Sequence, residues 1–144
     1  MRMAVGCDHR GLDVKQVVIK LVTGFDYSYK DFGCYAADPV DYPDVAKGVA
    51  EAVSRGDFEF GVLVCDTGIG MSIAANKVKG IRAALCHDSF SASRARQHND
   101  ANILCLAAVD GTGAVAEIVD AFFTSQFEGG RHLVRLNKIR AMEG

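Results

Sequence analysis

The segment GVLVCDTGIGMSIAANK, Gly61 to Lys77, decides the fold of this chain. It begins as an apolar run typical of a buried β-strand, ends that run at Cys65, and passes through a Thr-Gly-Ile-Gly turn into a short helix. This order places the Cys65 thiol at the carboxyl end of a strand and at a helix N-terminus. Free backbone N–H groups and the helix dipole at that point favour negative charge, so we expect the thiolate to form readily there.

A thiolate base beside N–H groups that can hold an oxyanion suits proton abstraction next to a carbonyl group. The strand pattern alone supports a second interpretation, in which Cys65 is simply a small apolar residue of the core. Both interpretations remain open on the local sequence.

Composition limits the class of protein. With 144 residues, of which 49% are apolar, the chain is long enough for one domain with a proper core. The net charge of -2 and the pI near 6.0 argue against binding to nucleic acid. No apolar run approaches the ~20 residues of a membrane span, and the first residues predict no secretory leader. Five cysteines without a CxxC pair predict no disulfide framework and indicate a reducing cytoplasm.

Strand-like and helical patterns alternate along the chain. Apolar runs predict strands at Arg2–Cys7, Tyr27–Phe32, Phe60–Cys65, Ile81–Cys86 and Asn102–Leu106. Helical patterns cover Leu12–Val22, a segment from Pro43 to Gly56, Ile69–Asn76, Asp88–His98, Ala114–Phe123 and Arg131–Met142. Hydrophobic strands separated by helices predict a parallel sheet covered on both faces. Because no linker or repeat interrupts the pattern, residues 1–144 are predicted to form a single domain.

Polar residues follow three of the predicted strands. They are Asp8 and His9, then Asp66 to Gly70, then His87 and Asp88. Parallel sheets bind ligands outside the carboxyl ends of their strands, so these groups can converge on one crevice. Each also has an ordinary interpretation: Asp8 and Asp88 as helix caps, His9 and His87 as loop histidines.

Two further segments carry candidate polar groups. His98 stands near a predicted helix C-terminus, where the dipole favours its protonated form and a role as general acid, or where it caps the last carbonyls. Arg131 and Arg135 are four residues apart, hence on one helix face, and two guanidinium groups suit a phosphate dianion. The alternative for the arginines is a solvated basic face.

No metal or nucleotide motif stands out. Cysteine and histidine residues after the strands could form a zinc site, namely Cys7, His9, Cys65, Cys86 and His87. No pair of them has the tight spacing of a structural zinc motif, so we expect no metal. The turn TGIG lacks the GxGxxG order of a dinucleotide site.

Six segments resemble one family. They are GCDHRG, VDYPD at residues 40–44, VCDTGIGMSIAANK, GIRAALC, SRARQHNDANIL and FEGGRH, in family order from residue 6 to 132. In these segments the chain resembles ribose-5-phosphate isomerase B and its galactose- and allose-6-phosphate relatives. The resemblance implies a Rossmann-like, single-domain, three-layer α/β/α sandwich with a five-stranded parallel sheet. It also implies no cofactor, and a homodimer or tetramer whose active sites are completed by the partner subunit.

The resemblance also implies residue roles. Cys65 is expected to move a proton between C1 and C2 of the open-chain sugar, and Thr67, Gly68, Ile69 and Gly70 to hold the enediolate. His98 is expected to open the furanose ring, with Asn99 beside it, from the partner subunit. The remaining expected substrate contacts are Asp8, His9, Tyr42, Asp66, Arg131 and Arg135.

The chain departs from the family pattern at two positions. Asp66 follows the cysteine where the family usually has glycine, and Val109 stands where an arginine usually helps to bind phosphate. The predicted function is isomerisation of ribose 5-phosphate and ribulose 5-phosphate in the pentose phosphate pathway. The alternatives are an allose or galactose 6-phosphate isomerase, and a sugar-phosphate-binding relative without catalysis.

Overall fold

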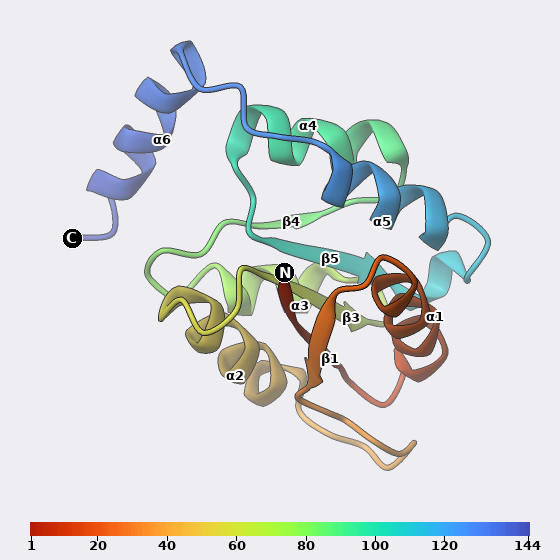
Figure 1. Ribbon diagram of the computed structural model, residues 1–144. Coiled ribbons are helices and arrows are strands. Elements are labelled where there is room, and N and C mark those ends of the chain that lie inside the picture. The colour runs from red at the N-terminus through yellow and green to blue at the C-terminus, as the bar shows by residue number, and fades with distance from the viewer.

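Strands and helices alternate along most of the chain in the computed structural model, which describes residues 1–144 (Figure 1). The strands are β1 Arg2–Cys7, β2 Ser28–Asp31, β3 Phe60–Cys65, β4 Ala83–Leu85 and β5 Ile103–Ala107. The helices are α1 Leu12–Gly24, α2 Tyr42–Ser54, α3 Ile69–Ala75, α4 Ser89–Asn99, α5 Val115–Thr124 and α6 Arg131–Ala141, with a 3-10 turn at Ala108–Asp110. None of these helices is both long and apolar enough to cross a membrane.

The five strands form one parallel sheet in the order β2-β1-β3-β5-β4. From β1 the chain goes to the edge strand β2 and then crosses to β3, on the other side of β1. It continues to the opposite edge strand β4, and β5 returns to lie between β3 and β4. In the register, Cys7 lies opposite Val64, and Cys65 lies opposite Ala107. The expected five-stranded parallel sheet is confirmed, and the carboxyl ends of β1 and β3 meet at one edge.

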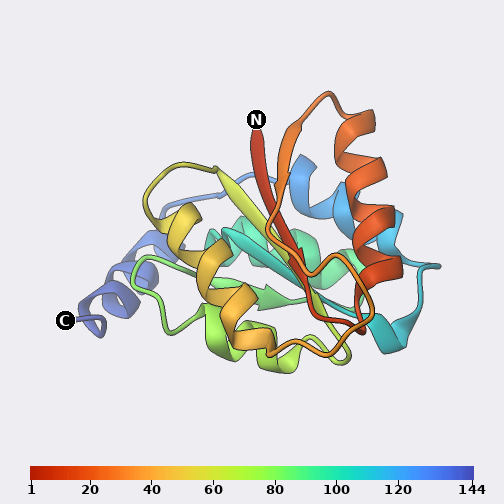
Figure 2. The same cartoon turned by 90° about the horizontal axis from the view of Figure 1, so that it is seen from below.

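Helices cover both faces of the sheet, as Figures 1 and 2 show. Helices α1, α4 and α5 pack on one face through Val18, Ala92 and Val119, against strand residues such as Val62 and Leu104. Burial of these branched side chains contributes about 1.5–3 kcal/mol for each full side chain. The near-continuous apolar strands follow from this double coverage, because both faces of each strand must pack.

Helices α2 and α3 pack on the opposite face. Val49 of α2 and Met71 of α3 are fully buried there and belong to the same core cluster as Leu63 and Cys65 of β3. Pro43 occupies the first turn of α2, where its missing N–H removes no helical hydrogen bond. This face carries the end of β3 and the turn that follows it.

The two edge strands are shorter than the sequence pattern predicted. The expected strand Ile81–Cys86 is reduced to β4, and Tyr27–Phe32 is reduced to β2. At the start of β4 the backbone of Ala83 bonds to a side chain and not to another strand. Its N–H donates to the side-chain oxygen of Asn76, and its carbonyl accepts from the side-chain nitrogen of Asn76. The N–H of Arg82 likewise donates to the side chain of Asn102. Side-chain hydrogen bonds at Arg82 and Ala83 thus take the place of strand pairing, and β4 is shorter than the apolar run predicted.

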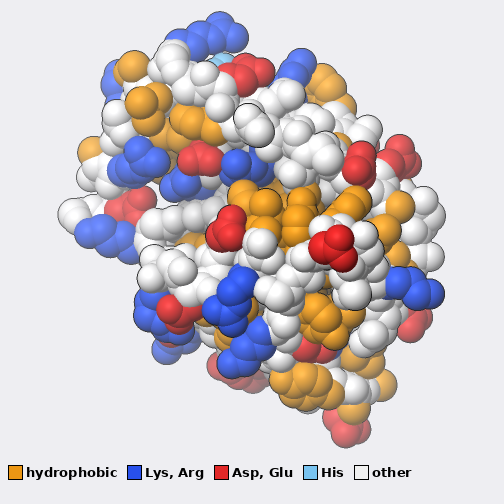
Figure 3. Space-filling view, in the orientation of Figure 1, with side chains coloured by type: hydrophobic (Ala, Val, Ile, Leu, Met, Phe, Trp, Pro, Cys, Tyr) orange, Lys and Arg blue, Asp and Glu red, His pale blue; other side chains and the backbone are white.

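Helix α6 stands apart from the sandwich, at the upper left of Figure 1. Gly129 and Gly130 precede it with φ of 68° and 56°, a backbone region that favours glycine. Of its apolar residues only Leu136 is buried, and a hollow of about 390 Å³ lies between α6 and the body. Figure 3 shows basic and apolar side chains together in this region of the surface.

Candidate active site

Cys65 is the last residue of β3, directly before the glycine-rich turn. Its side chain is 5% exposed and belongs to the core cluster beneath α2 and α3. Cys65 therefore packs as a core residue, as the second interpretation predicted, and it lies at the expected place at the strand end beside the start of α3.

The turn after Cys65 depends on glycine at position 68. Gly68 has φ of 75°, and a Cβ there would meet the Leu85 side chain and lie 3.0 Å from the carbonyl oxygen of Leu106. The Thr67 hydroxyl oxygen accepts a hydrogen bond from the N–H of Ile69 at 3.3 Å. The other N–H groups at the start of α3 have no partner within the helix, as at any helix N-terminus.

Tyr42, the first residue of α2, lies against this turn. A Cβ placed on Gly70 would be 2.9 Å from the Tyr42 hydroxyl oxygen. The close approach explains why a glycine is needed at position 70 and confirms that Tyr42 is adjacent to the segment from Cys65 to Gly70. Both residues line a hollow of about 630 Å³ between α2 and α3.

Asp8 and His9 extend from the neighbouring strand β1. The N–H of Asp8 donates to the carbonyl of Val64 at 3.1 Å, which brings Asp8 beside the end of β3. The Asp8 carboxylate is buried and accepts from the N–H of Arg10 at 2.9 Å. The interpretation of Asp8 as the cap of α1 is wrong, because Gly11 occupies that position. Nδ1 of His9 accepts from the N–H of Val40 at 3.3 Å.

We call Asp8, His9, Tyr42 and Cys65 to Gly70 the thiol half-site. His87 does not join it in a direct contact: its Nδ1 is 2.6 Å from the Asp110 carboxylate. Asp88 is the N-cap of α4 in a capping box with Ser91, as one of its two sequence interpretations predicted. The hydrogen bond from the Ser91 N–H lowers the pKa of the Asp88 carboxyl.

Three other cysteines are uncharged at neutral pH. Burial raises the pKa of the Cys7 thiol to about 12 and that of Cys86 to about 11, and it also raises the pKa of Cys105. They serve as packing residues. The structure does not gather the cysteine and histidine residues after the strands into a set of metal ligands.

The other predicted polar residues form a second group. His98 and Asn99 from the end of α4 and Arg131 and Arg135 from α6 line one hollow of about 350 Å³. Helix α4 ends just before β5 begins, so this group lies near the edge where strands start, whereas Cys65 lies where they end. The structure therefore brings these four residues together but does not bring them to the thiol.

Sequence reasoning missed two members of this second group, His132 and Glu128. The rings of His98 and His132 stack with centroids 4.1 Å apart and planes at 13°. Nε2 of each ring is 3.7 Å from the same carboxylate oxygen, Oε1 of Glu128. The spacing of Glu128 and His132 in FEGGRH, four residues apart, was the available signal. We call His98, Asn99, Glu128, Arg131, His132 and Arg135 the histidine half-site.

Several basic side chains surround the one carboxylate of the histidine half-site. The pKa of His132 is lowered, chiefly by desolvation and then by the nearby positive charges of His98 and Arg131. Arg131 and Arg135 are exposed in the single chain, and Arg135 donates to the carbonyl of Arg131 at 3.0 Å. The donor atoms of His98, Glu128 and His132 lie within 4.8 Å of one another, so these three residues could also hold a divalent cation such as zinc.

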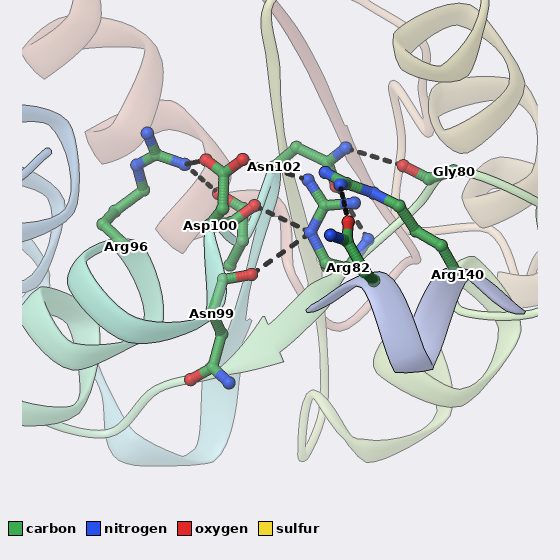
Figure 4. A network of polar contacts seen from close by, with 9 residues as sticks. Gly80, Arg82, Arg96, Asn99, Asp100, Asn102 and Arg140 are labelled. Carbon is green, nitrogen blue, oxygen red and sulfur yellow. Dashed lines mark hydrogen bonds and ion pairs between the residues drawn. The ribbon is translucent and has the colours of Figure 1, made fainter. Parts of the chain in front are cut away.

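A polar network fixes the end of α4 and hence His98 (Figure 4). Asp100 ends the helix with φ of 46° and pairs with Arg96 at 2.9 Å and with Arg82 at 3.3 Å. Arg82 also donates to the carbonyls of Asn99 and Asp100 at 3.1 and 3.0 Å. These bonds satisfy the free carbonyls of the last helical turn, so the histidine half-site rests on a rigid terminus.

The fold is a doubly wound α/β sandwich with a thiol and a glycine turn at the end of its third strand. The chain belongs to the Ribose/Galactose Isomerase family, whose sequence profile matches residues 3–139.

Relatives match over nearly the whole chain. Ribose-5-phosphate isomerase B of Escherichia coli is 42% identical, over 99% of this chain and 96% of its own. The structure of ribose-5-phosphate isomerase B from Clostridium thermocellum superposes with a TM-score of 0.97 at 44% identity, covering 99% and 97% of the two chains. A structure of ribose-5-phosphate isomerase B from Mycoplasma genitalium with bound ribulose 5-phosphate superposes with a TM-score of 0.94 at 39% identity. The match covers 99% of this chain and 95% of the other chain.

Proposed function

We propose that this protein interconverts ribose 5-phosphate and ribulose 5-phosphate as an aldose–ketose isomerase. The observation that carries the proposal is the position of Cys65, at the end of β3 beside the turn that begins α3. The likeness to ribose-5-phosphate isomerases B over almost the full chain supports the substrate. The family description also includes galactose isomerases, which keeps a hexose 6-phosphate as the second candidate substrate.

The proposed reaction needs one base and one oxyanion site. The Cys65 thiolate takes the proton from C2 of the open-chain aldose, and the electron pair forms the C1–C2 double bond as negative charge moves to O1. The proton on O2 then passes to O1, and the thiol returns its proton to C1, which gives the ketose. N–H groups of the turn from Thr67 to Gly70 hold the charged oxygen. A general base contributes about 10²–10⁴-fold, and an oxyanion donor about 10²–10³-fold.

Substrate binding is assigned to the remaining predicted residues. Asp8, His9, Tyr42 and Asp66 would contact the sugar, and Arg131 and Arg135 would hold its phosphate. Phosphate binding away from the reacting carbons keeps C1 and C2 near the thiol. We propose no metal or redox cofactor for this proton transfer.

A homodimer would complete each site. The thiol half-site and the histidine half-site are separated within one chain, so the second half-site must come from another copy if both act on one sugar. Exposed apolar residues of α6 support such an interface, among them Leu133, Val134 and Ile139. We also place the enzyme in the cytoplasm, a location that suits five free cysteines.

The decisive experiment measures solvent exchange. Wild-type protein in deuterium oxide should incorporate deuterium at C1 of ribulose 5-phosphate, followed by NMR. Cys65→Ala should abolish both the exchange and turnover, whereas the matched control Cys34→Ala should retain both. Exchange that persists in Cys65→Ala would remove the assigned base, and binding without any exchange in the wild type would indicate a sugar-phosphate-binding protein.

A further inference from the structure

Glu128 lies outside the thiol half-site, and its carboxylate faces two histidine rings. One oxygen of its carboxylate faces Nε2 of His98 and Nε2 of His132 at the same distance, 3.7 Å. Neither the proposed proton transfer nor the phosphate contacts use this carboxylate. It nevertheless stands beside the imidazole to which ring opening is assigned.

The backbone fixes Glu128 to α4. Its N–H donates to the carbonyl of Gln97 at 3.0 Å, and Gln97 directly precedes His98. Glu128 is also four residues before His132, which lies in the first turn of α6. The carboxylate therefore has a set position relative to both imidazoles and connects the end of α4 to the phosphate-binding helix.

We propose that Glu128 is a positioning residue for ring opening, whose carboxylate orients the His98 imidazole. The proposal rests on the proposed function, because it assigns His98 to the ring form of the substrate. His132 contributes by stacking, which keeps the plane of the His98 ring fixed.

Two contacts together fix the His98 ring. The rings of His98 and His132 lie nearly parallel with centroids 4.1 Å apart, and Oε1 of Glu128 faces Nε2 of both rings. The side chain of His132 is 11% exposed, whereas that of His98 is 33% exposed. His98 is therefore the imidazole that a bound sugar can reach more easily.

The ring-opening step needs a proton at a defined atom. In the furanose, the C1–O4 bond breaks, its electron pair goes to O4, and O4 takes the proton of His98. The hydroxyl proton on O1 leaves to water as the C1–O1 double bond forms, and water returns a proton to His98. The step is an internal rearrangement without oxidation or reduction. A carboxylate behind His98 keeps the imidazole in one orientation before each turnover.

The experiment separates ring opening from proton transfer. Ribulose 5-phosphate cannot form a furanose, because its C5 oxygen carries the phosphate, so deuterium exchange at its C1 requires the thiol half-site and the phosphate contacts but no ring opening. Ribose 5-phosphate must first open its ring. Glu128→Gln keeps the size of the side chain and removes its charge, Glu128→Asp restores the charge, and Glu117→Gln is a matched exposed control on α5.

We expect Glu128→Gln to lower kcat on ribose 5-phosphate by about 10²-fold, with the exchange rate into ribulose 5-phosphate and KM unchanged. Glu128→Asp should recover part of the loss, and Glu117→Gln should match the wild type. Wild-type kcat in Glu128→Gln would overturn the proposal. So would an equal loss of exchange and turnover, because Glu128 would then act on the fold or on phosphate binding. Absence of exchange in the wild type would instead defeat the proposed function.

Discussion

The backbone N–H of Val109 donates to the carbonyl oxygen of Asp66 at 2.9 Å. The resemblance predicts glycine in place of Asp66 and arginine in place of Val109, and these two positions are therefore direct neighbours at the end of the sheet. Both side chains are exposed, that of Val109 at 63%. Relative to the expected pattern, Asp66 adds a negative charge and Val109 lacks a positive one, so both residues make the electrostatic potential near the thiol half-site more negative.

Removing the Asp66 charge should raise turnover. A carboxylate next to Cys65 opposes both the thiolate and the enediolate, and two like charges about 4 Å apart repel by about 1 kcal/mol when water screens them fully. Asp66→Asn and Asp66→Gly should each raise kcat by about fivefold, measured in a coupled assay with Asp120→Asn as an exposed control. A tenfold loss in Asp66→Asn would instead show that the charge of Asp66 helps to bind the sugar more than it opposes the enediolate.

Restoring an arginine at position 109 should improve phosphate binding. Val109 is exposed, so the longer side chain can be accommodated without loss of core packing. A charge-assisted hydrogen bond to phosphate contributes about 1.5–3 kcal/mol, so Val109→Arg should lower KM for ribose 5-phosphate by about tenfold. Inhibition by inorganic phosphate should strengthen in parallel. An unchanged KM, with Val109→Leu as the uncharged control, would place this position outside the phosphate site.

Adding a methyl group to Gly68 should destabilise the protein. Gly68 has φ of 75° and is crowded by Leu85 and Leu106, so alanine there meets both backbone strain and a steric clash. The free energy of unfolding should fall by about 1–3 kcal/mol, measured by urea denaturation. Gly113→Ala is the control, since its Cβ would meet nothing within 4 Å and its φ is not positive. Equal stability of the two variants would contradict this account of the turn.

Much of the fold could be predicted because the apolar pattern of each strand and helix is contained in a short stretch of sequence. The apolar runs that become β1, β3 and β5 are buried on both faces, so their sequence pattern is nearly continuous. The start of β4 depends on two side chains: Asn76 bonds the backbone of Ala83, and Asn102 accepts from the N–H of Arg82, directly before the strand. No local pattern carries that information, and the predicted strand was therefore too long.

The thiol half-site was equally accessible to sequence reasoning. Parallel strands bring their ends together, so Asp8 and Cys65 had to be close once the sheet was predicted. The pairing of His98 with Glu128 and His132 depends on how the segment before α6 returns to α4, which the hydrogen bond from Glu128 to Gln97 decides. Such long-range packing has no periodic signature, and both partners of His98 were missed.

The buried thiol of Cys86 predicts a loss of stability at alkaline pH. Its pKa rises from 9.0 to about 11 on folding, because burial disfavours the thiolate. A folded-state pKa above the unfolded value gives a contribution that is complete below pH 9 and is lost as the pH rises through about 11. Between these values the free energy of unfolding should fall by about 1.4 kcal/mol for each pH unit from this group. Cys86→Ala should show a shallower decline in urea titrations at pH 8, ~9.5 and ~10.5, and parallel declines in the two proteins would assign the alkaline transition to other groups.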